Sequence, residues 1–321
     1  MTSRDEAMQR WRGVLAPIVT PFGEDGSLDL RSLRANVEWL VGQGASAENT
    51  VLLAAGSGGD FTSMSIAERK QVIETIVEVA RGEIPVIAGV QTLDVRDCID
   101  LCQFCERIGV DAVQISGPFY YDGRPGDVVA WMNEVARHTS VGFAAYNNWY
   151  TGYDMPLELV ERLLDIPNVV AVKWSSPNVD IFQEGIRRLS GRVAVVNNTF
   201  HTILGHLAGC RVFVSHWPNF YPQFCWRIWE LMERGDYARA HQEFERAMVP
   251  YQALVARIAA ATGGEGVFVR PAMELVGLAG GTSRLPSRDE AVTPEIREGY
   301  RRLLEAVRAD ERTTIDGHVN V

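Results

Sequence analysis

Short apolar runs alternate with longer amphipathic segments along most of the chain. The apolar runs are rich in β-branched residues and are bounded by Gly, Pro or Asn, which is typical of buried strands. The amphipathic segments between them, such as LRSLRANVEWLVGQG and SIAERKQVIETIVEVARG, end near Gly or Pro, as helices do. The pattern predicts eight strands, at residues 13–20, 50–56, 85–91, 111–117, 141–147, 168–174, 192–198 and 211–217.

This order of elements predicts the fold class. Apolar strands that alternate with helices form a parallel sheet covered on both faces, and eight such units close into a barrel. We expect an α/β fold, a (β/α)8 TIM barrel, over residues 13–225, after an N-terminal extension at 1–12. Additional C-terminal helices at 226–310 complete the same domain, and a polar tail follows at 311–321. A doubly wound open sheet is the alternative, but no G-x-G-x-x-G segment opens a helix, so the signature of a dinucleotide site is absent.

Composition and charge limit the partners. Forty-six per cent of the 321 residues are hydrophobic, which allows a large core, and the formal net charge is −10. An acidic protein is repelled by nucleic acid and by anionic membrane surfaces, so we expect neither as a partner. No apolar stretch is long enough to cross a bilayer, and the first residues lack the apolar core of a signal peptide. We therefore expect a cytoplasmic protein.

The cysteines and histidines do not predict a metal site. Cys98, Cys102 and Cys105 are spaced i, i+4 and i+7 in a segment with helical pattern, which is the spacing of a buried helix face. The six histidines have no metal-ligand spacing, and only His216 directly follows an apolar strand. A metal-dependent barrel hydrolase needs histidines and carboxylates at several strand ends, and the predicted strand ends lack them.

Lysine is rare, with only two among the 31 basic residues. Lys70, in AERKQV, occupies an ordinary solvated position, whereas Lys173, in NVVAVKW, is expected at the carboxyl end of a buried strand. Burial of an ammonium group is unfavourable and lowers its pKa. Two interpretations follow: a lysine that reaches the surface or pairs with a carboxylate, or a neutral amine kept for covalent chemistry, which arginine cannot perform.

The other predicted strand ends supply chemistry that suits such an amine. The active site of a TIM barrel lies at the carboxyl ends of its strands. Ser57 follows the second strand in a glycine-rich turn, Tyr120 and Tyr121 follow the fourth, and Tyr146 ends the fifth. Singly, these residues are explained as turn or core residues. Together with Lys173 they are the parts of a Schiff-base site, in which an amine attacks a carbonyl, a phenol moves protons and a turn holds a carboxylate.

Several motifs occur in the order and spacing of a known family. GVLAPIVTPFGEDGSLDLRSL, GSGGDFTSMSIAER, GVDAVQISGPFYY, VVAVKWSS and GGTSRLP resemble those of the dihydrodipicolinate synthase / N-acetylneuraminate lyase family, and the resemblance covers roughly residues 12–305. It implies a homotetrameric barrel, often a dimer of dimers. It also implies a lysine that forms an imine with pyruvate or another 2-oxo acid, without a metal or organic cofactor.

The resemblance assigns four catalytic candidates. By motif position, Lys173 corresponds to the Schiff-base lysine and Tyr146 to the proton donor and acceptor. Ser57 takes the place of the first hydroxyl residue of the glycine-rich motif. Tyr120 takes the place of an aromatic residue that, in the synthases, reaches across a dimer interface.

The departures from the family pattern bear on substrate binding. Gly58 replaces the second hydroxyl of the motif, and Asp60 replaces its final acid. Tyr150 stands where lysine-pathway synthases place the arginine that grips aspartate semialdehyde, and Asn197 and Asn198 replace a Gly-Asp-like segment. Val214 matches a position whose backbone carbonyl faces the bound 2-oxo acid. We expect the substrate-binding residues to be Gly58, Gly59, Val214, Tyr150 and Asn197.

These features predict a class I aldolase or lyase that joins or cleaves a 2-oxo acid and an aldehyde. The distal pocket is expected to be aromatic and neutral, which favours an uncharged or aromatic aldehyde, or a polyol chain, over an acidic semialdehyde. The alternatives are a dehydratase acting on a deoxy-keto-sugar acid and a catalytically silent, ligand-binding member of the family. The residues expected to line the distal pocket are Phe119, Trp149, Tyr150, Tyr153 and Trp217.

Overall fold

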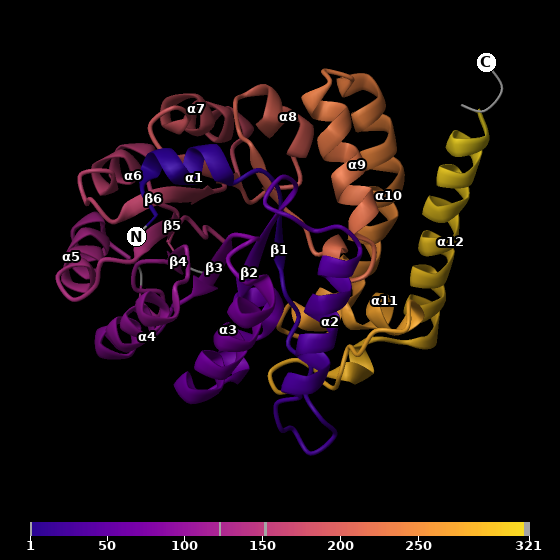
Figure 1. Cartoon of the computed structure of the whole chain (residues 1–321), viewed down its shortest axis with the longest axis horizontal. Helices are drawn as coiled ribbons and strands as arrows, with labels where there is room; N and C mark the ends of the chain where they lie inside the picture. The colour runs from indigo at the N-terminus through magenta and orange to yellow at the C-terminus, as the bar shows by residue number, and fades with distance from the viewer. Residues whose placement is uncertain (1, 122, 151–152, 318–321) are drawn as a thin grey trace.

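Eight parallel strands form a closed barrel in the computed structural model, which describes residues 2–121, 123–150 and 153–317, with side chains up to residue 309 (Figure 1). Each strand pairs with the next along the chain, and β1 pairs with β8. Every strand lies inside a predicted range, so the TIM barrel is confirmed and the open-sheet alternative is wrong. The strands are β1 (Gly13–Pro17), β2 (Thr50–Ala54), β3 (Val86–Gly89), β4 (Ala112–Ile115), β5 (Gly142–Tyr146), β6 (Val169–Trp174), β7 (Ala194–Asn197) and β8 (Val212–Val214).

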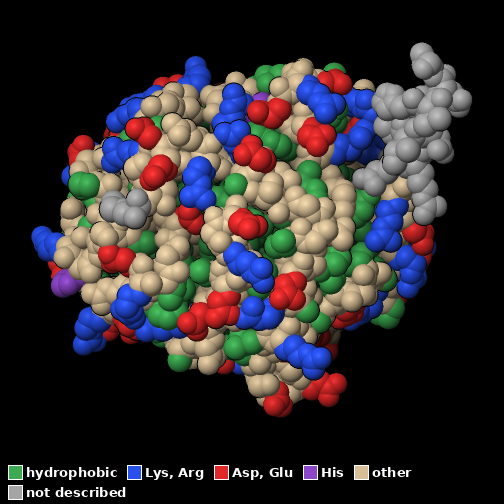
Figure 2. Space-filling view, viewed as in Figure 1, with side chains coloured by type: hydrophobic (Ala, Val, Ile, Leu, Met, Phe, Trp, Pro, Cys, Tyr) green, Lys and Arg blue, Asp and Glu red, His purple; other side chains and the backbone are tan. Residues whose placement is uncertain are grey.

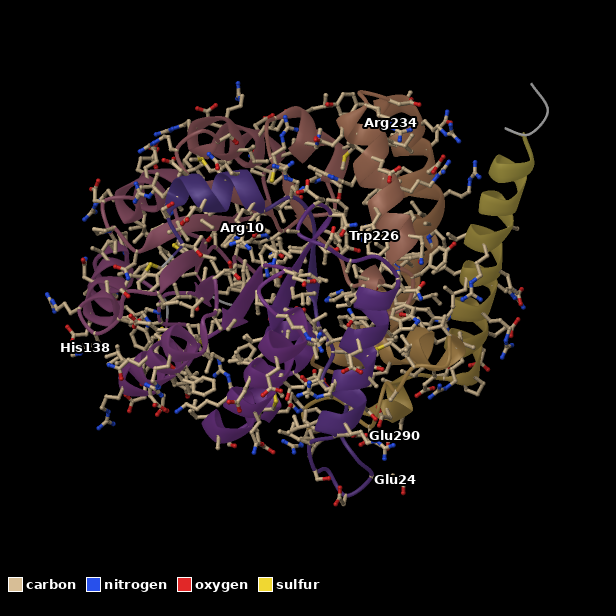
Figure 3. All side chains as sticks on the ribbon, viewed as in Figure 1. Arg10, Glu24, His138, Trp226, Arg234 and Glu290 are labelled. Carbon is tan, nitrogen blue, oxygen red and sulfur yellow. The ribbon has the colours of Figure 1, made fainter. Side chains whose placement is uncertain are left out.

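Eight helices surround the barrel and bury one face each against the strands. In α4, the buried face contains Cys98, Cys102 and Cys105, which confirms the interpretation of their spacing. Trp226 lies between α9 and the barrel, where its Nε1 donates a 3.0 Å hydrogen bond to Thr50 Oγ1 (Figure 3). The helices are α2 (Leu30–Gly42), α3 (Ile66–Ala80), α4 (Val95–Ile108), α5 (Pro125–Ala136), α6 (Leu157–Leu163), α7 (Val179–Leu189), α8 (Thr202–Leu207) and α9 (Pro222–Glu233).

The N-terminal segment forms a helix, α1 (Arg4–Arg10), that closes the amino end of the barrel. Ala7 and Trp11 are fully buried in the apolar cluster that fills the barrel interior. Arg4 Nε donates a 2.8 Å hydrogen bond to the carbonyl of Val169, which ties the helix to β6. The extension that the sequence predicted at 1–12 is therefore part of the barrel core, and its capping box at Ser3 fixes where the helix begins.

The C-terminal helices extend the domain beyond the eighth unit. The expected boundary at residue 225 falls inside α9, so the additional helices begin with α10 (Tyr237–Ala259), followed by α11 (Arg270–Leu275) and α12 (Pro294–Gly317). Figure 1 shows α12 on the outer side of α10 and α11. It continues through most of the segment expected as a polar tail, of which 318–321 lie outside the described residues. Five short 3-10 helices are η1 (Ser57–Gly59), η2 (Phe61–Ser63), η3 (Trp217–Asn219), η4 (Gly266–Phe268) and η5 (Asp289–Ala291).

The surface carries charges of both signs, and acidic and basic side chains are interspersed over the face shown in Figure 2. In the described part of the chain, no helix combines the length and apolarity that a membrane span requires. On the face shown, neither acidic nor basic side chains gather into a patch of one charge. The expectations about partners and cellular location stay predictions.

Candidate active site

Lys173 lies on the floor of the cleft at the carboxyl end of the barrel. Strand alternation places it one layer above Ala171, whose side chain belongs to the interior cluster. Lys173 is 6% exposed, and its Nζ donates a 2.9 Å hydrogen bond to Gln114 Oε1 on β4. In the described part of the chain, no carboxylate lies within ion-pair distance of Nζ. Burial therefore lowers the pKa of Lys173 to about 8, which favours the interpretation of this residue as a reactive amine.

Tyr146, at the end of the neighbouring strand β5, lies directly beside the amine. Lys173 Nζ is 4.3 Å from the centroid of the Tyr146 ring. The Tyr146 hydroxyl lies 3.1 Å from the hydroxyl of Tyr150, and Asn198 Nδ2 donates to it at 3.4 Å. Burial raises the pKa of Tyr146 well above its usual value, so the phenol stays protonated. Tyr150 is 47% exposed as a residue and lines the same cavity as Tyr146.

The glycine-rich turn after β2 approaches the barrel closely. A Cβ atom on Gly59 would lie 2.7 Å from the carbonyl oxygen of Ile18, so this position requires glycine. Ser57 and Gly58 line the same cavity as Lys173. Asp60, which replaces the motif's final acid, points away from that cavity and forms a buried ion pair with Arg270 of α11. The acid of this motif therefore fastens the turn to the C-terminal helices.

Two cavities open at this end of the barrel. The lysine cavity, of about 680 Å³, contains Lys173, Val214 and His216. The aromatic cavity, of about 840 Å³, is lined by Phe61, Phe119, Tyr153 and Phe268 among others. Apart from Lys173, no lysine or arginine lines either cavity in the described part of the chain. Both cavities share Ser57, Tyr146, Tyr150, Glu265 and Phe268 on their walls.

The expected distal aromatic residues divide between the two cavities, with one exception. Phe119 and Tyr153 line the aromatic cavity, Trp149 lines the lysine cavity, and Tyr150 lines both. Trp217 is fully buried away from both, so its expected position was wrong. The turn after β8 directs its ring into the core between the barrel and α9, where it packs against Phe224, Phe220 and Tyr251. Residues 151 and 152 of the same expected loop lie outside the described residues.

Three predicted site residues, Gly59, Tyr120 and Asn197, line neither cavity of the single chain. Tyr120 is 74% exposed and contacts Tyr121 edge to face, at 5.0 Å between ring centroids. Its role across a subunit interface stays a prediction. The side chain of Asn197 binds within its own loop, accepting from the Thr199 amide at 2.8 Å and donating to the His201 carbonyl at 3.2 Å. The neighbouring Asn198, rather than Asn197, lines the lysine cavity.

The structure adds two residues that the sequence analysis missed. Gln114 holds the lysine amine, and the signal for it was a lone amide in the apolar strand DAVQISG. Glu265 reaches both cavities from the segment between α10 and η4. Burial raises the pKa of Glu265, and the nearby Lys173 acts in the opposite direction. His216, noted only for following a strand, has its Nε2 3.8 Å from Glu265 Oε2.

Comparison with known proteins places this geometry in a family. The profile of the dihydrodipicolinate synthetase family matches residues 10–307. The 4-hydroxy-tetrahydrodipicolinate synthase of Halorhodospira halophila is 30% identical over 282 residues, which cover 86% of this chain and 91% of that protein. The corresponding synthase of Bradyrhizobium diazoefficiens is 29% identical over 294 residues, with 87% and 92% covered.

Solved structures are similar over nearly the whole chain. The chloride-inhibited dihydrodipicolinate synthase of Acinetobacter baumannii, complexed with pyruvate, has a TM-score of 0.81 and 26% identity, covering 93% of this chain and 99% of that one. The sialic acid aldolase of Ruminococcus gnavus has a TM-score of 0.83 at 20% identity, covering 94% and 99%, and it shares the fold. From the profile match and the curated relatives, the chain belongs to the dihydrodipicolinate synthetase family and is an aldolase-type lyase.

Proposed function

We propose that Lys173 forms a Schiff base with a pyruvate-type 2-oxo acid and that the enzyme makes or breaks a carbon–carbon bond between this acid and an aldehyde. The observation that carries the proposal is the buried amine of Lys173, which has a lowered pKa, a neutral amide partner and the Tyr146 phenol beside it. A neutral amine in a water-poor site is the nucleophile that imine formation requires. No metal or organic cofactor is needed for this chemistry.

The steps follow from the two side chains. Neutral Lys173 Nζ adds to C2 of the 2-oxo acid, and the carbonyl oxygen takes a proton to give a carbinolamine. Loss of that oxygen as water leaves an iminium ion. In the cleavage direction, the iminium accepts the electron pair of the C3–C4 bond while the C4 hydroxyl loses its proton, which releases the aldehyde. The resulting enamine is protonated at C3 and hydrolysed to the free 2-oxo acid.

Tyr146 is proposed to move these protons. Its hydroxyl group stays protonated in the free enzyme, and it is hydrogen-bonded to the hydroxyl of Tyr150. A positioned acid–base group of this kind typically contributes about 10²–10⁴-fold to the rate. Ser57, on the wall of the lysine cavity, is proposed to hydrogen-bond the carboxylate of the 2-oxo acid, and the carbonyl of Val214 is proposed to face the bound acid.

The distal walls support an uncharged or aromatic aldehyde rather than aspartate semialdehyde. A site for the semialdehyde needs a fixed cation for its carboxylate, and a bidentate guanidinium suits this best. Tyr150 and Trp149 stand on the loop after β5, and Arg124 is exposed at the start of α5, outside both cavities. A carboxylate against these aromatic walls would lose its hydration without gaining a partner.

A dehydratase on a deoxy-keto-sugar acid is the second candidate, and Glu265 favours it. Its carboxyl group lies on the wall shared by the two cavities, and burial raises its pKa, which favours the protonated form. A protonated carboxyl near the substrate chain could donate its proton to a departing hydroxyl group. Product analysis by mass spectrometry separates the candidates, because cleavage gives two smaller molecules and dehydration gives one product that has lost water.

Borohydride trapping tests the Schiff base. Incubation with pyruvate and borohydride should add a stable mass to Lys173, detected by peptide mass spectrometry. The other lysine, Lys70, serves as an internal control, because it pairs with Asp100 on the surface. Labelling of Lys70 alone, or absence of labelling with every 2-oxo acid of a panel, would contradict the mechanism.

The substrate preference has its own test, a side-by-side measurement of kcat/KM. We expect condensation of pyruvate with aspartate semialdehyde to be negligible beside release of pyruvate from 2-oxo acids with a neutral or aromatic distal group. A semialdehyde value of about 10⁴ M⁻¹s⁻¹ or more, ordinary for a physiological enzyme, would mean that another residue supplies the missing cation. The homotetramer proposed with Tyr120 at an interface is tested separately, by the mass of the protein in solution before and after Tyr120→Ala.

A further inference from the structure

His216 has a buried ring nitrogen without a hydrogen-bond partner, next to the reactive lysine. The residue follows β8 and lines the lysine cavity together with Ser57, Gly58 and Lys173. Its Nε2 is shielded from solvent and makes no hydrogen bond with any described residue. The closest carboxylate oxygen, on Glu265, lies 3.8 Å away, which is beyond hydrogen-bond distance. A buried polar atom without a partner usually marks a place where a ligand or water binds.

The ring fills the space that a side chain at position 58 would occupy. A Cβ atom built on Gly58 would lie 2.9 Å from His216 Nε2, 3.1 Å from His216 Cδ2 and 3.0 Å from Pro17 Cβ. Contacts below 3.0 Å do not occur between a Cβ atom and a rigid ring. A hydroxyl residue at position 58 and the imidazole in its present position therefore exclude each other. The glycine and the histidine form a matched pair, in which the ring nitrogen lies 2.9 Å from the position that the Cβ atom of a serine or threonine would take.

The charge of the ring suits a hydrogen-bond donor to an anion. Burial, with the positive charge of Lys173 nearby, lowers the pKa of His216 to about 4, so the ring is neutral near pH 7. Once Lys173 has become an iminium ion, its charge is fixed and continues to disfavour protonation of the imidazole. A neutral imidazole still carries one N–H, and Nε2–H can donate to a carboxylate without placing a second cation beside the iminium.

We propose that His216 Nε2 donates a hydrogen bond to the carboxylate of the 2-oxo acid, and that the Gly58–His216 pair thereby replaces a second hydroxyl in the glycine-rich turn. The inference deepens the Schiff-base function proposed above and rests on it. It makes His216 a determinant of the acid group of the substrate. The competing explanation is that the ring only pairs with Glu265 and supports the cavity wall.

The test compares pyruvate with pyruvamide, which has the same reactive carbonyl but no carboxylate. For each, the concentration that gives half-maximal borohydride labelling of Lys173 is measured. His216→Phe keeps a ring of similar size and removes the donor. We expect it to raise the half-maximal concentration of pyruvate about 10- to 100-fold, the range for loss of a hydrogen bond to a charged group. The value for pyruvamide should change less than about threefold. His216→Gln, which restores an N–H donor, should recover part of the affinity for pyruvate.

Further variants test whether a side chain at position 58 and the His216 ring compete for the same space. Gly58→Ser alone should weaken labelling by both compounds, because its Cβ collides with the ring. Gly58→Ser combined with His216→Ala should restore the affinity for pyruvate to within about tenfold of the parent, since a hydroxyl then has room and can donate. Glu265→Gln should leave the ratio of pyruvate to pyruvamide affinity unchanged. Thermal melts and circular dichroism of each variant establish that it is folded.

The outcomes distinguish failure of the His216 proposal from failure of the Schiff-base function. Equal losses for pyruvate and pyruvamide in His216→Phe would show that the ring supports the wall and does not bind the carboxylate. Gly58→Ser that labels as well as the parent would overturn the shared-space argument. No labelling of Lys173 in the parent enzyme by either compound would instead refute the Schiff-base function on which this inference rests.

Discussion

Lys173 and Arg270 are both buried cations near the carboxyl end of the barrel, but their surroundings are opposite. Arg270 is 2% exposed and forms an ion pair with Asp60, and it also donates to the carbonyls of Gly280, at 2.9 Å, and Thr20, at 3.2 Å. Lys173 is 6% exposed and has only the neutral amide of Gln114 as a hydrogen-bond acceptor. Both terminal nitrogens of the Arg270 guanidinium have acceptors, one of them a carboxylate, whereas no described carboxylate pairs with Lys173.

The difference separates a structural cation from a chemical one. Arginine cannot lose its proton in a protein, so it is the suitable residue for a permanent buried ion pair. That pair joins the glycine-rich turn to α11 and so holds the turn over the lysine cavity. Burial of a lysine without a counter-ion lowers its pKa, and a lowered pKa favours the neutral amine that the proposed Schiff-base reaction requires. Each of the following predictions tests one side of this contrast.

The largest effect is expected from Lys173→Arg. The substitution keeps a positive charge and removes the amine that forms the imine, so turnover should fall below detection while the fold is retained. Steady-state assays of pyruvate release, with circular dichroism as a check of folding, measure both. The matched control is Lys70→Arg, which should retain parental activity because Lys70 only pairs with Asp100. Activity of Lys173→Arg within tenfold of the parent would rule out the amine as nucleophile.

Tyr146→Phe should produce the next largest loss. The ring still packs beside Lys173, while the hydroxyl that moves protons is removed. We expect kcat to fall about 10²–10⁴-fold, with a much smaller change in KM. Tyr150→Phe is the control: it removes a hydroxyl one step further from the amine and should cost less. A rise in KM with kcat unchanged would make Tyr146 a binding residue instead.

Breaking the Asp60–Arg270 ion pair should destabilise the folded protein without removing a group that takes part in the proposed reaction. Asp60→Asn leaves the guanidinium buried without a counter-ion, and the expected loss in the free energy of unfolding is about 3–5 kcal/mol. Asparagine is chosen because residue 60 has a φ of 55°, which asparagine tolerates. Urea unfolding of this variant, of Arg270→Met and of the double variant forms a double-mutant cycle. Additive losses in the double variant would show that the two residues do not act as a pair.

Lys173→Met should instead increase the free energy of unfolding. The folded-state pKa of about 8 lies below the ordinary value of 10.5, so the native state holds the ammonium less favourably than the unfolded chain does. Removing the group should therefore raise the free energy of unfolding at pH 7, by up to about 3 kcal/mol, since one pKa unit corresponds to about 1.4 kcal/mol. Urea unfolding measures the change. A loss of stability would mean that Lys173 is as well paired as Arg270.

The sequence predicted the barrel and the adjacent positions of Tyr146 and Lys173, because both depend on local pattern. Eight apolar runs place Tyr146 and Lys173 at the ends of adjacent strands, and the structure pairs the two residues in register. The N-terminal helix was not predicted, because only Ala7 of its residues is fully buried and its apolar pattern is weak. All four positions of β4 are buried, so burial alone could not show that Gln114 faces the amine.

The walls of the site could not be predicted because they come from distant segments. Glu265 follows two glycines in a stretch without periodicity, and it reaches the cavities only because α10 returns the chain to the mouth of the barrel. Trp217 was assigned to the pocket because it follows β8, but the η3 turn directs it into the core. Asn197 and Asn198 are neighbours in sequence, and only the loop geometry determines which one faces the cavity.

The last prediction concerns the pH dependence of the labelling rate, which requires no change to the protein. Because the neutral form of Lys173 attacks the carbonyl, the rate of borohydride labelling by pyruvate should rise about tenfold per pH unit below the pKa and level off above about 8. His216, with a pKa of about 4, is already neutral over this range.

Glu265 gives a further test of this pH dependence, because its negative charge favours the ammonium form of Lys173. Glu265→Gln removes that attraction, and the midpoint of the pH–rate profile should then move below the parental value. The variant keeps the size of the side chain, so the shift reports charge rather than packing. Gln114→Leu is the comparison, since it removes a neutral acceptor and should also lower the midpoint by leaving the ammonium without its hydrogen bond. A midpoint near 10.5 in the parent enzyme would place Lys173 in contact with water, and the contrast with Arg270 would then rest on solvation of the amine rather than on the absence of a counter-ion.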